Sequence, residues 1–173
     1  QRTGRPDIPE LEPSFYGFTD ADQETVFDTS NTFFGKDRMS LRELLNSLRQ
    51  TYCGTLGAEY MYTTDMRQKR WWQQKLEGIR SHPEFSNEKK KHILARLTAA
   101  EGLERYLHTK YVGQKRFSLE GGESFIAAMD ELIQAAGNQG LQEVVIGMAH
   151  RGRLNVLVNI MGKMPKDLFA EFD

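Results

Sequence analysis

The chain has 173 residues, a length that suffices for one hydrophobic core. Its 23 basic and 24 acidic side chains leave a net charge of -1, so no overall field attracts it to nucleic acid or to an anionic membrane. No apolar run approaches the roughly 20 residues that span a bilayer, and we expect neither a nucleic-acid nor a membrane partner. As the single cysteine, Cys53 cannot form an internal disulfide, which favours a reducing compartment.

Both ends of the sequence are typical of a fragment. The chain opens with Gln1 rather than Met, and it stops at Asp173 inside an amphipathic segment that Pro165 begins. We therefore expect a piece of a longer protein.

Residues 1–39 are predicted to form an extended, partly ordered arm. They contain Pro6, Pro9 and Pro13 and show no sustained hydrophobic period. The arm has too many aromatic residues for a pure linker, and we expect these to pin it onto a larger body. The aromatic residues are Phe15, Tyr16, Phe18, Phe27, Phe33 and Phe34.

Residues 40–113 are predicted to be a helical region. Ser40 and Glu43 match a capping box, which begins a helix that Gly54 ends. The next segment, residues 57–64, contains aromatic side chains and favours a short strand.

Two further helical patterns complete this region. Thr64 or Asp65 caps a charged helix that ends before Pro83. Ser86 opens a long pattern with apolar residues every three or four positions. Its length predicts two helices that meet near Thr98.

Residues 114–173 are predicted to begin an α/β domain. A compact loop leads to a helix over residues 123–136, which Gly137 ends in a left-handed conformation. Residues 143–149 are β-branched and apolar, as in a buried strand, and a helical pattern follows directly. The fold class is therefore α/β, mostly helical in these residues, with further strands expected beyond Asp173.

His150 lies at this junction of strand and helix, where ligands collect in open α/β sheets. Arg151 and Arg153 beside it favour an anion, although either could pair with surface carboxylates, and a backbone carbonyl could equally bind the His150 ring. Arg116 and Phe117 form a second candidate pair. From position alone, the favoured interpretation is Phe117 in the core and Arg116 in solvent.

The remaining motifs do not indicate a phosphate-binding or metal-binding site. Gly121 and Gly122 fit neither spacing of a phosphate-binding loop. The other histidines, His82, His92 and His108, have no spacing that would join them to a fourth ligand. We therefore expect no metal site formed by these residues.

Four stretches, in this order, resemble the thiamine-diphosphate-dependent first component of the 2-oxoglutarate dehydrogenase complex. They are residues 51–61 (TYCGTLGAEYM), 97–107 (LTAAEGLERYL), 116–122 (RFSLEGG) and 147–157 (GMAHRGRLNVL). The resemblance runs from about Pro13 to the end of the chain. Ala149, where mitochondrial relatives tend to carry Pro, indicates a bacterial and hence cytoplasmic protein; a eukaryotic one would lie in the mitochondrial matrix.

The resemblance implies a homodimer of transketolase-like architecture that binds thiamine diphosphate and Mg²⁺ between two α/β domains. By the match of motifs, His150 would contact substrate and assist proton transfer, and Phe117 would pack against cofactor and substrate. Arg116 would hold the cofactor through its diphosphate. The family's Mg²⁺ ligands and a second active-site histidine belong to a later stretch that is absent here, so we expect the chain alone to be inactive.

The implied reaction is the oxidative decarboxylation of 2-oxoglutarate in the tricarboxylic acid cycle. The succinyl unit passes to a lipoyl group on the partner dihydrolipoyl succinyltransferase. Two alternatives stay open. The related 2-oxoadipate dehydrogenase differs by one substrate methylene, worth only about 1–3 kcal/mol. A non-catalytic helical docking module, with Trp71 and Trp72 at the contact, is the second alternative, and the His150 motif argues against it.

Overall fold

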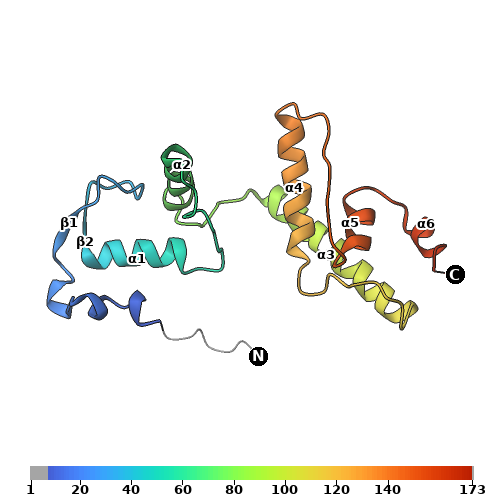
Figure 1. Cartoon of the computed structure of the whole chain (residues 1–173), viewed down its shortest axis with the longest axis horizontal. Helices are drawn as coiled ribbons and strands as arrows, with labels where there is room; N and C mark the ends of the chain where they lie inside the picture. Colours follow the sequence, from blue (N-terminus) through green and yellow to red (C-terminus); the bar gives the residue numbers. More distant parts are fainter. Residues whose placement is uncertain (1–7, 173) are drawn as a thin grey trace. The chain divides into compact units, whose positions relative to one another are not determined.

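The computed structural model describes residues 8–172, so the predictions on Gln1, Pro6 and Asp173 lie outside the described residues. The chain divides into two compact units, one that ends at Glu84 and one that begins at Phe85 (Figure 1). Each unit has its own helices, and strands are few. Among the described residues, no helix is both long and apolar enough to cross a membrane. The three-part division of the chain at residues 39 and 113 stays a prediction.

The first unit combines short turns, a two-stranded hairpin and two helices (Figure 1). In the hairpin the strands pair antiparallel, with Phe27 opposite Met39. The elements are three 3-10 turns (Pro9–Leu11, Pro13–Tyr16, Asp20–Asp22), strands β1 (Val26–Asp28) and β2 (Arg38–Ser40), and helices α1 (Leu41–Tyr52) and α2 (Met66–Glu77).

The starts of both helices follow from local capping. The Ser40 hydroxyl accepts from the Glu43 amide while the Glu43 carboxylate accepts from the Ser40 amide, which confirms the predicted capping box of α1. Asp65, rather than Thr64, caps α2 by accepting from the Arg67 amide. These bonds satisfy amides that have no partner inside the first helical turn.

The predicted strand over residues 57–64 is wrong. Tyr60 is buried, at 5% exposure, but the chain turns at once, and the Thr63 amide donates to the Tyr60 carbonyl over 3.0 Å. A strand needs a neighbouring strand to bind its backbone groups. The only two strands within residues 8–172 are paired with each other.

The arm is pinned to the rest of its unit by only some of its aromatic residues. Phe34 is buried, and the neighbouring Phe33 lies under the guanidinium of Arg70, 4.4 Å from its ring centroid. These contacts confirm that part of the prediction. Phe15 and Tyr16 pack against each other but stay 57% and 64% exposed, so the prediction is wrong for them.

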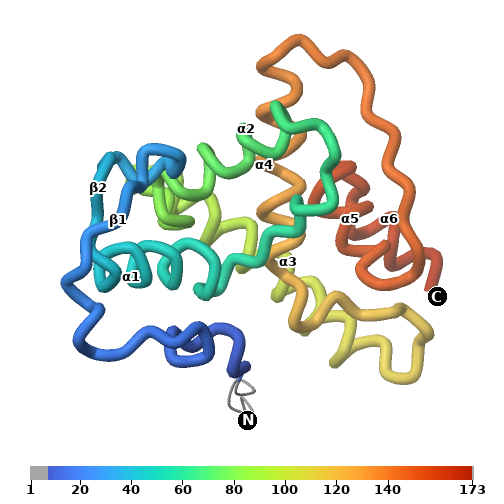
Figure 2. Tube along the Cα trace, turned by 60° about the vertical axis from the view of Figure 1, so that its left-hand side comes forward, coloured from blue at the N-terminus to red at the C-terminus, as the bar shows by residue number. Residues whose placement is uncertain are grey.

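The second unit consists of helices that pack around a long central one (Figures 1 and 2). Helix α3 contacts both α4 and α5. One core cluster contains Ala100, Leu119, Ile126 and Val156, and another contains Leu107, Leu154 and Leu168. The helices are α3 (Asn87–Lys110), α4 (Ser124–Asn138), α5 (Arg153–Asn159) and α6 (Pro165–Phe169).

Helix α3 is a single helix, so the predicted break near Thr98 is wrong. The Thr98 hydroxyl donates to the Leu94 carbonyl over 2.8 Å, which satisfies the hydroxyl without ending the helix. Ser86 caps this helix as predicted, since its hydroxyl accepts from the Lys89 amide. Helix α4 also forms as predicted but ends later, because Gly140 and not Gly137 takes the left-handed conformation, at φ 89°.

The predicted strand over residues 143–149 is wrong as well. This segment connects α4 to α5 without regular structure, and Val145 is 96% exposed. Within the described part of the chain, no strand lies beside it and none of its backbone groups makes a backbone hydrogen bond. Its β-branched sequence favours an extended conformation, but a strand requires a partner at hydrogen-bonding distance.

Candidate active site

Two loops that are distant in sequence meet beside α3 in the second unit. The Gly152 amide donates to the Phe117 carbonyl over 2.8 Å. The Arg151 guanidinium donates to the next carbonyl, that of Ser118, over 3.0 Å. The loop that contains Phe117 and the loop that contains His150 are thus joined by two bonds to adjacent carbonyls.

This junction stacks the ring of Phe117 on the ring of His150. The ring centroids lie 4.8 Å apart, and the planes differ by 28°. Both residues are exposed, Phe117 at 48%. No hydrogen bond engages the His150 ring among residues 8–172, so the carbonyl-bound alternative is not the arrangement found. Neither nitrogen of the His150 ring is therefore hydrogen-bonded by another residue in this part of the chain.

The backbone at the stack is unusual at two positions. Phe117 has φ 48°, in the left-handed region that side chains other than glycine rarely adopt. Gly152 has φ 79°, and a Cβ there would lie 2.7 Å from Leu119 Cδ1. Gly152 therefore permits a close approach of its loop to Leu119, a core residue at 5% exposure.

Arg116 is partly buried beside the buried carboxylate of Glu104. Its guanidinium donates to Glu104 Oε2 over 2.6 Å, and the two side chains are only 11% and 3% exposed. A weaker contact at 3.5 Å joins it to Glu120. The interpretation from position alone, with Phe117 in the core and Arg116 in solvent, is wrong: Phe117 is exposed and the Arg116 side chain is mostly covered.

Glu104 is the hub of a buried polar network. Its Oε2 also accepts from the Ser118 hydroxyl over 2.9 Å, and its Oε1 accepts from Asn155 Nδ2 over 3.2 Å. Asn155 is fully buried and also donates to the Ala100 carbonyl over 3.0 Å. Asn159 donates to Asn155 Oδ1 over 2.6 Å. The network joins α3, α5 and the loop of Phe117.

Sequence reasoning did not single out Glu104 or Asn155. A signal was present, because Glu104 lies on the same helical face as Ala100 and Leu107, at spacings of four and three. A carboxylate in the middle of an apolar face is rarely buried without a partner. Its partner comes from another segment, which is why helical periodicity alone does not identify it.

Among the remaining cationic and histidine candidates, His108 contacts this cluster, since its Nδ1 lies 3.4 Å from Arg116 Nη2. Arg153 is exposed, and no carboxylate pairs with it among the described residues. His92 instead pairs with Asp130 across α3 and α4, with Nε2 2.6 Å from Oδ2. In the part of the chain that the structure describes, no group of three or more His, Cys, Asp or Glu residues could hold a metal ion.

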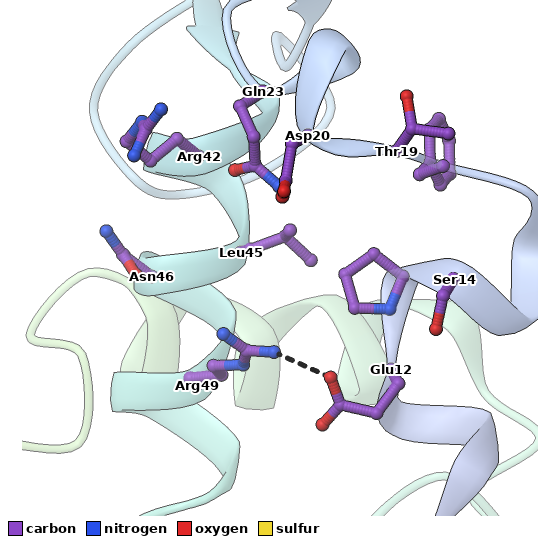
Figure 3. A pocket seen from close by; sticks show the side chains of 11 residues that line it. Glu12, Ser14, Thr19, Asp20, Gln23, Arg42, Leu45, Asn46 and Arg49 are labelled. Carbon is purple, nitrogen blue, oxygen red and sulfur yellow. Dashed lines mark ion pairs between the residues drawn. The ribbon is translucent and has the colours of Figure 1, made fainter.

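A separate hollow of about 560 Å³ lies in the first unit, between the 3-10 turns and α1 (Figure 3). Arg42 and Arg49 line it, but both are already paired. Arg49 lies 3.6 Å from Glu12, as the dashed line in Figure 3 marks, and Arg42 lies 2.9 Å from Glu24. Because the charges of both arginines are compensated, the hollow does not favour an anion. The stack of Phe117 and His150 is therefore the stronger candidate for the functional site.

Comparison with known proteins finds similar sequences. The chain is 73% identical, over all 173 residues, to the 2-oxoglutarate dehydrogenase E1 component of Cupriavidus necator. It is 54% identical over the same 173 residues to that of Azotobacter vinelandii, and 48% identical over 165 residues, 95% of the chain, to that of Haemophilus influenzae. Over its whole length, the chain is similar to 2-oxoglutarate dehydrogenase E1 components.

This similarity confirms the resemblance predicted from the four motifs. The chain spans 18% of the length of each of these three relatives. No protein-family model matches the chain. Within the described residues, the candidate site is the cluster of Phe117, His150, Arg116 and Glu104.

Proposed function

We propose that the protein carrying this chain is a 2-oxoglutarate dehydrogenase E1 enzyme. It would decarboxylate 2-oxoglutarate oxidatively and pass the succinyl unit to a lipoyl group on a dihydrolipoyl succinyltransferase, within the tricarboxylic acid cycle. The observation that carries this proposal is the 73% identity to an E1 component over the entire chain. The relatives compared are bacterial, and we place the protein in the bacterial cytoplasm.

The residues of the stack fit one part of thiamine diphosphate, the proposed cofactor. Phe117 offers a half-exposed aromatic ring, a surface that suits a planar heterocycle. When bound, the cofactor would supply a carbon nucleophile and an electron sink for the decarboxylation. Phe117 would then pack against cofactor and substrate and limit the room for longer 2-oxo acids.

Arg116 fits the diphosphate less directly. Its guanidinium is engaged by Glu104 at 2.6 Å and is 11% exposed. Its Nη2 also lies 3.5 Å from Glu120 and 3.4 Å from His108 Nδ1. A guanidinium has five N–H donors, however, so these partners leave others for a second anion. We keep Arg116 as a proposed cofactor contact that acts while it stays bound to Glu104.

His150 would move protons at the substrate. Its ring is exposed, and no group among residues 8–172 hydrogen-bonds it, so a substrate oxygen can approach either nitrogen. Proton transfer by a positioned imidazole contributes about 10² to 10⁴ in rate. The exposed Arg151 and Arg153 next to His150 would attract the distal carboxylate of a dicarboxylic substrate.

The rest of the proposed enzyme lies outside the described residues. It comprises the Mg²⁺ ligands, a second active-site histidine and further strands of a transketolase-like α/β domain in a homodimer. The exposed and β-branched segment 143–149 is available to such strands, with Val144 and Val145 49% and 96% exposed. Pairing with a neighbouring strand would satisfy its backbone groups.

The test is the reaction of the complete enzyme. Purified enzyme should release carbon dioxide from 2-oxoglutarate only when thiamine diphosphate and Mg²⁺ are present. It should also succinylate the lipoyl domain of the partner acyltransferase. A preference for 2-oxoadipate would contradict the substrate assignment, and cofactor-independent turnover would contradict the proposed chemistry.

A further inference from the structure

We propose that Glu104 is a positioning residue that sets the ring of Phe117 against the ring of His150. The inference rests on the proposed function, because it concerns the geometry of that same site. It adds a buried residue that is not itself one of the two stacked rings. Glu104 is 2% exposed and lies on α3, in a different segment from both rings.

The carboxylate of Glu104 binds both sequence neighbours of Phe117. Oε2 accepts from the Arg116 guanidinium at 2.6 Å and from the Ser118 hydroxyl at 2.9 Å. One oxygen atom thus holds the residue before Phe117 and the residue after it. The Phe117 side chain takes no part in these hydrogen bonds and stays 48% exposed.

The backbone of Phe117 requires such a support. Its φ of 48° costs on the order of 1–3 kcal/mol for a residue with a Cβ, and conformations of this kind persist only where the surroundings fix them. The flanking contacts to Glu104 provide that constraint on one side. On the other side, the Gly152 amide binds the Phe117 carbonyl at 2.8 Å.

Glu104 also connects to the helix that follows His150. Its Oε1 accepts from Asn155 on α5 at 3.2 Å, and the Asn155 side chain is fully buried. One carboxylate therefore contacts the loop of one ring and the helix next to the other ring. A change in its geometry displaces the two rings relative to each other.

Stability alone does not account for this buried charge. Replacing a buried ion pair by apolar residues of similar volume is often neutral or stabilising, so such pairs are weak contributors to folding. The distinctive property of the Glu104 pair is geometric, because it fixes the direction of the strained loop. We therefore assign Glu104 the role of positioning the Phe117 loop, rather than only that of stabilising the fold.

The experiment is a double-mutant cycle in the complete enzyme, with Glu104→Gln, Phe117→Ala and the two combined. We expect Glu104→Gln to lower kcat/KM for 2-oxoglutarate roughly tenfold in the wild-type background and less than about threefold in the Phe117→Ala background. Glu104→Gln should also shift the ratio of kcat/KM for 2-oxoglutarate and 2-oxoadipate in the same direction as Phe117→Ala. A purely structural defect would not change that ratio.

Two further variants serve as a control and as a substitute for Glu104→Gln. Glu101→Gln is the matched control, because Glu101 lies one turn earlier on α3, is exposed, and pairs with Arg105 at 3.7 Å. It should leave kcat/KM and the substrate ratio unchanged. If Glu104→Gln does not fold, Ser118→Ala removes one of the two flanking contacts without altering charge, and it should show the same dependence on Phe117.

The outcomes separate this inference from the proposed function. Equal losses in both backgrounds, or an unchanged substrate ratio, would overturn the positioning role of Glu104 while the site itself stands. Normal activity in both Phe117→Ala and His150→Ala would overturn the proposed site, and the positioning role with it.

Discussion

The amide of Gly152 donates to the carbonyl of Phe117 over 2.8 Å, and this bond joins the loop before α5 to the loop before α4. It forms because Gly152 adopts φ 79° and brings its backbone against Leu119. The neighbouring Arg151 adds a bond to the Ser118 carbonyl at 3.0 Å. The stack of Phe117 on His150 depends on this contact between loops.

A first prediction concerns Gly152→Ala. The added Cβ would lie 2.7 Å from Leu119 Cδ1, and Leu119 cannot move freely because it is buried. Left-handed backbone costs a residue with a Cβ about 1–2 kcal/mol, and overpacking of a core adds about 1–3 kcal/mol. We expect urea unfolding of the chain, followed by circular dichroism, to show the sum of both costs.

The matched control is Gly162→Ala. Gly162 has a similar φ of 75°, but nothing lies within 4 Å of a Cβ there. Gly162→Ala should lower the free energy of unfolding only by the cost of the left-handed backbone. Equal losses for the two variants would contradict the close packing of Gly152 on Leu119.

A second prediction concerns Arg116→Ala. The substitution leaves Glu104 buried without its cationic partner, and breaking a buried pair in this way costs about 3 kcal/mol or more. Arg105→Ala is the control, because Arg105 and its partner Glu101 are 77% and 59% exposed; exposed pairs contribute about 0–1 kcal/mol. Urea unfolding of the chain compares the two, and a similar small loss for both would refute the burial of Arg116.

A third prediction concerns pH. Partial burial raises the pKa of Tyr52, which is 37% exposed, and its hydrogen bonds with Tyr60 and Glu77, at 3.1 and 2.8 Å, raise it further. An unfolded tyrosine ionises near pH 10, whereas folded Tyr52 stays neutral there. The stability that this phenol contributes is therefore complete below about pH 10 and is lost as the pH rises above it.

Tyr52→Phe should consequently flatten the fall of the unfolding free energy with pH between about 9 and 11. Trp71 and Trp72 are the only tryptophans of the chain and lie on α2, in the same unit as Tyr52. Their fluorescence reports the unfolding of that unit. Tyr62→Phe, at a phenol that is 80% exposed, serves as the control. An unchanged slope in Tyr52→Phe would exclude this linkage.

The sequence correctly predicted the parts of the fold that depend on hydrogen bonds between residues close in sequence. Ser40, Asp65 and Ser86 each cap a helix through a bond to an amide two or three residues later. Such bonds need no distant partner, so the sequence suffices. The segment 143–149 had a strand sequence, but whether it forms a strand depends on a neighbour that local pattern does not reveal.

Only part of the candidate site was predicted, because the local sequence does not reveal partners that are distant along the chain. His150 and Phe117 were found through motifs, and their functional roles stay proposals. Their stacking, and the burial of Arg116 against Glu104, depend on contacts between α3, α5 and two loops. Long-range contacts of this kind reversed the exposure that position alone predicted for Arg116 and Phe117.

The most direct measurement of the central claim is the turnover of His150→Ala in the complete enzyme. If His150 moves protons at the substrate, kcat for 2-oxoglutarate should fall at least about tenfold. The dissociation constant for thiamine diphosphate should change by less than about threefold, since the smaller side chain leaves the loop bonds in place. His92→Ala, at an exposed histidine paired with Asp130, should turn over normally, and normal turnover in His150→Ala as well would contradict the account.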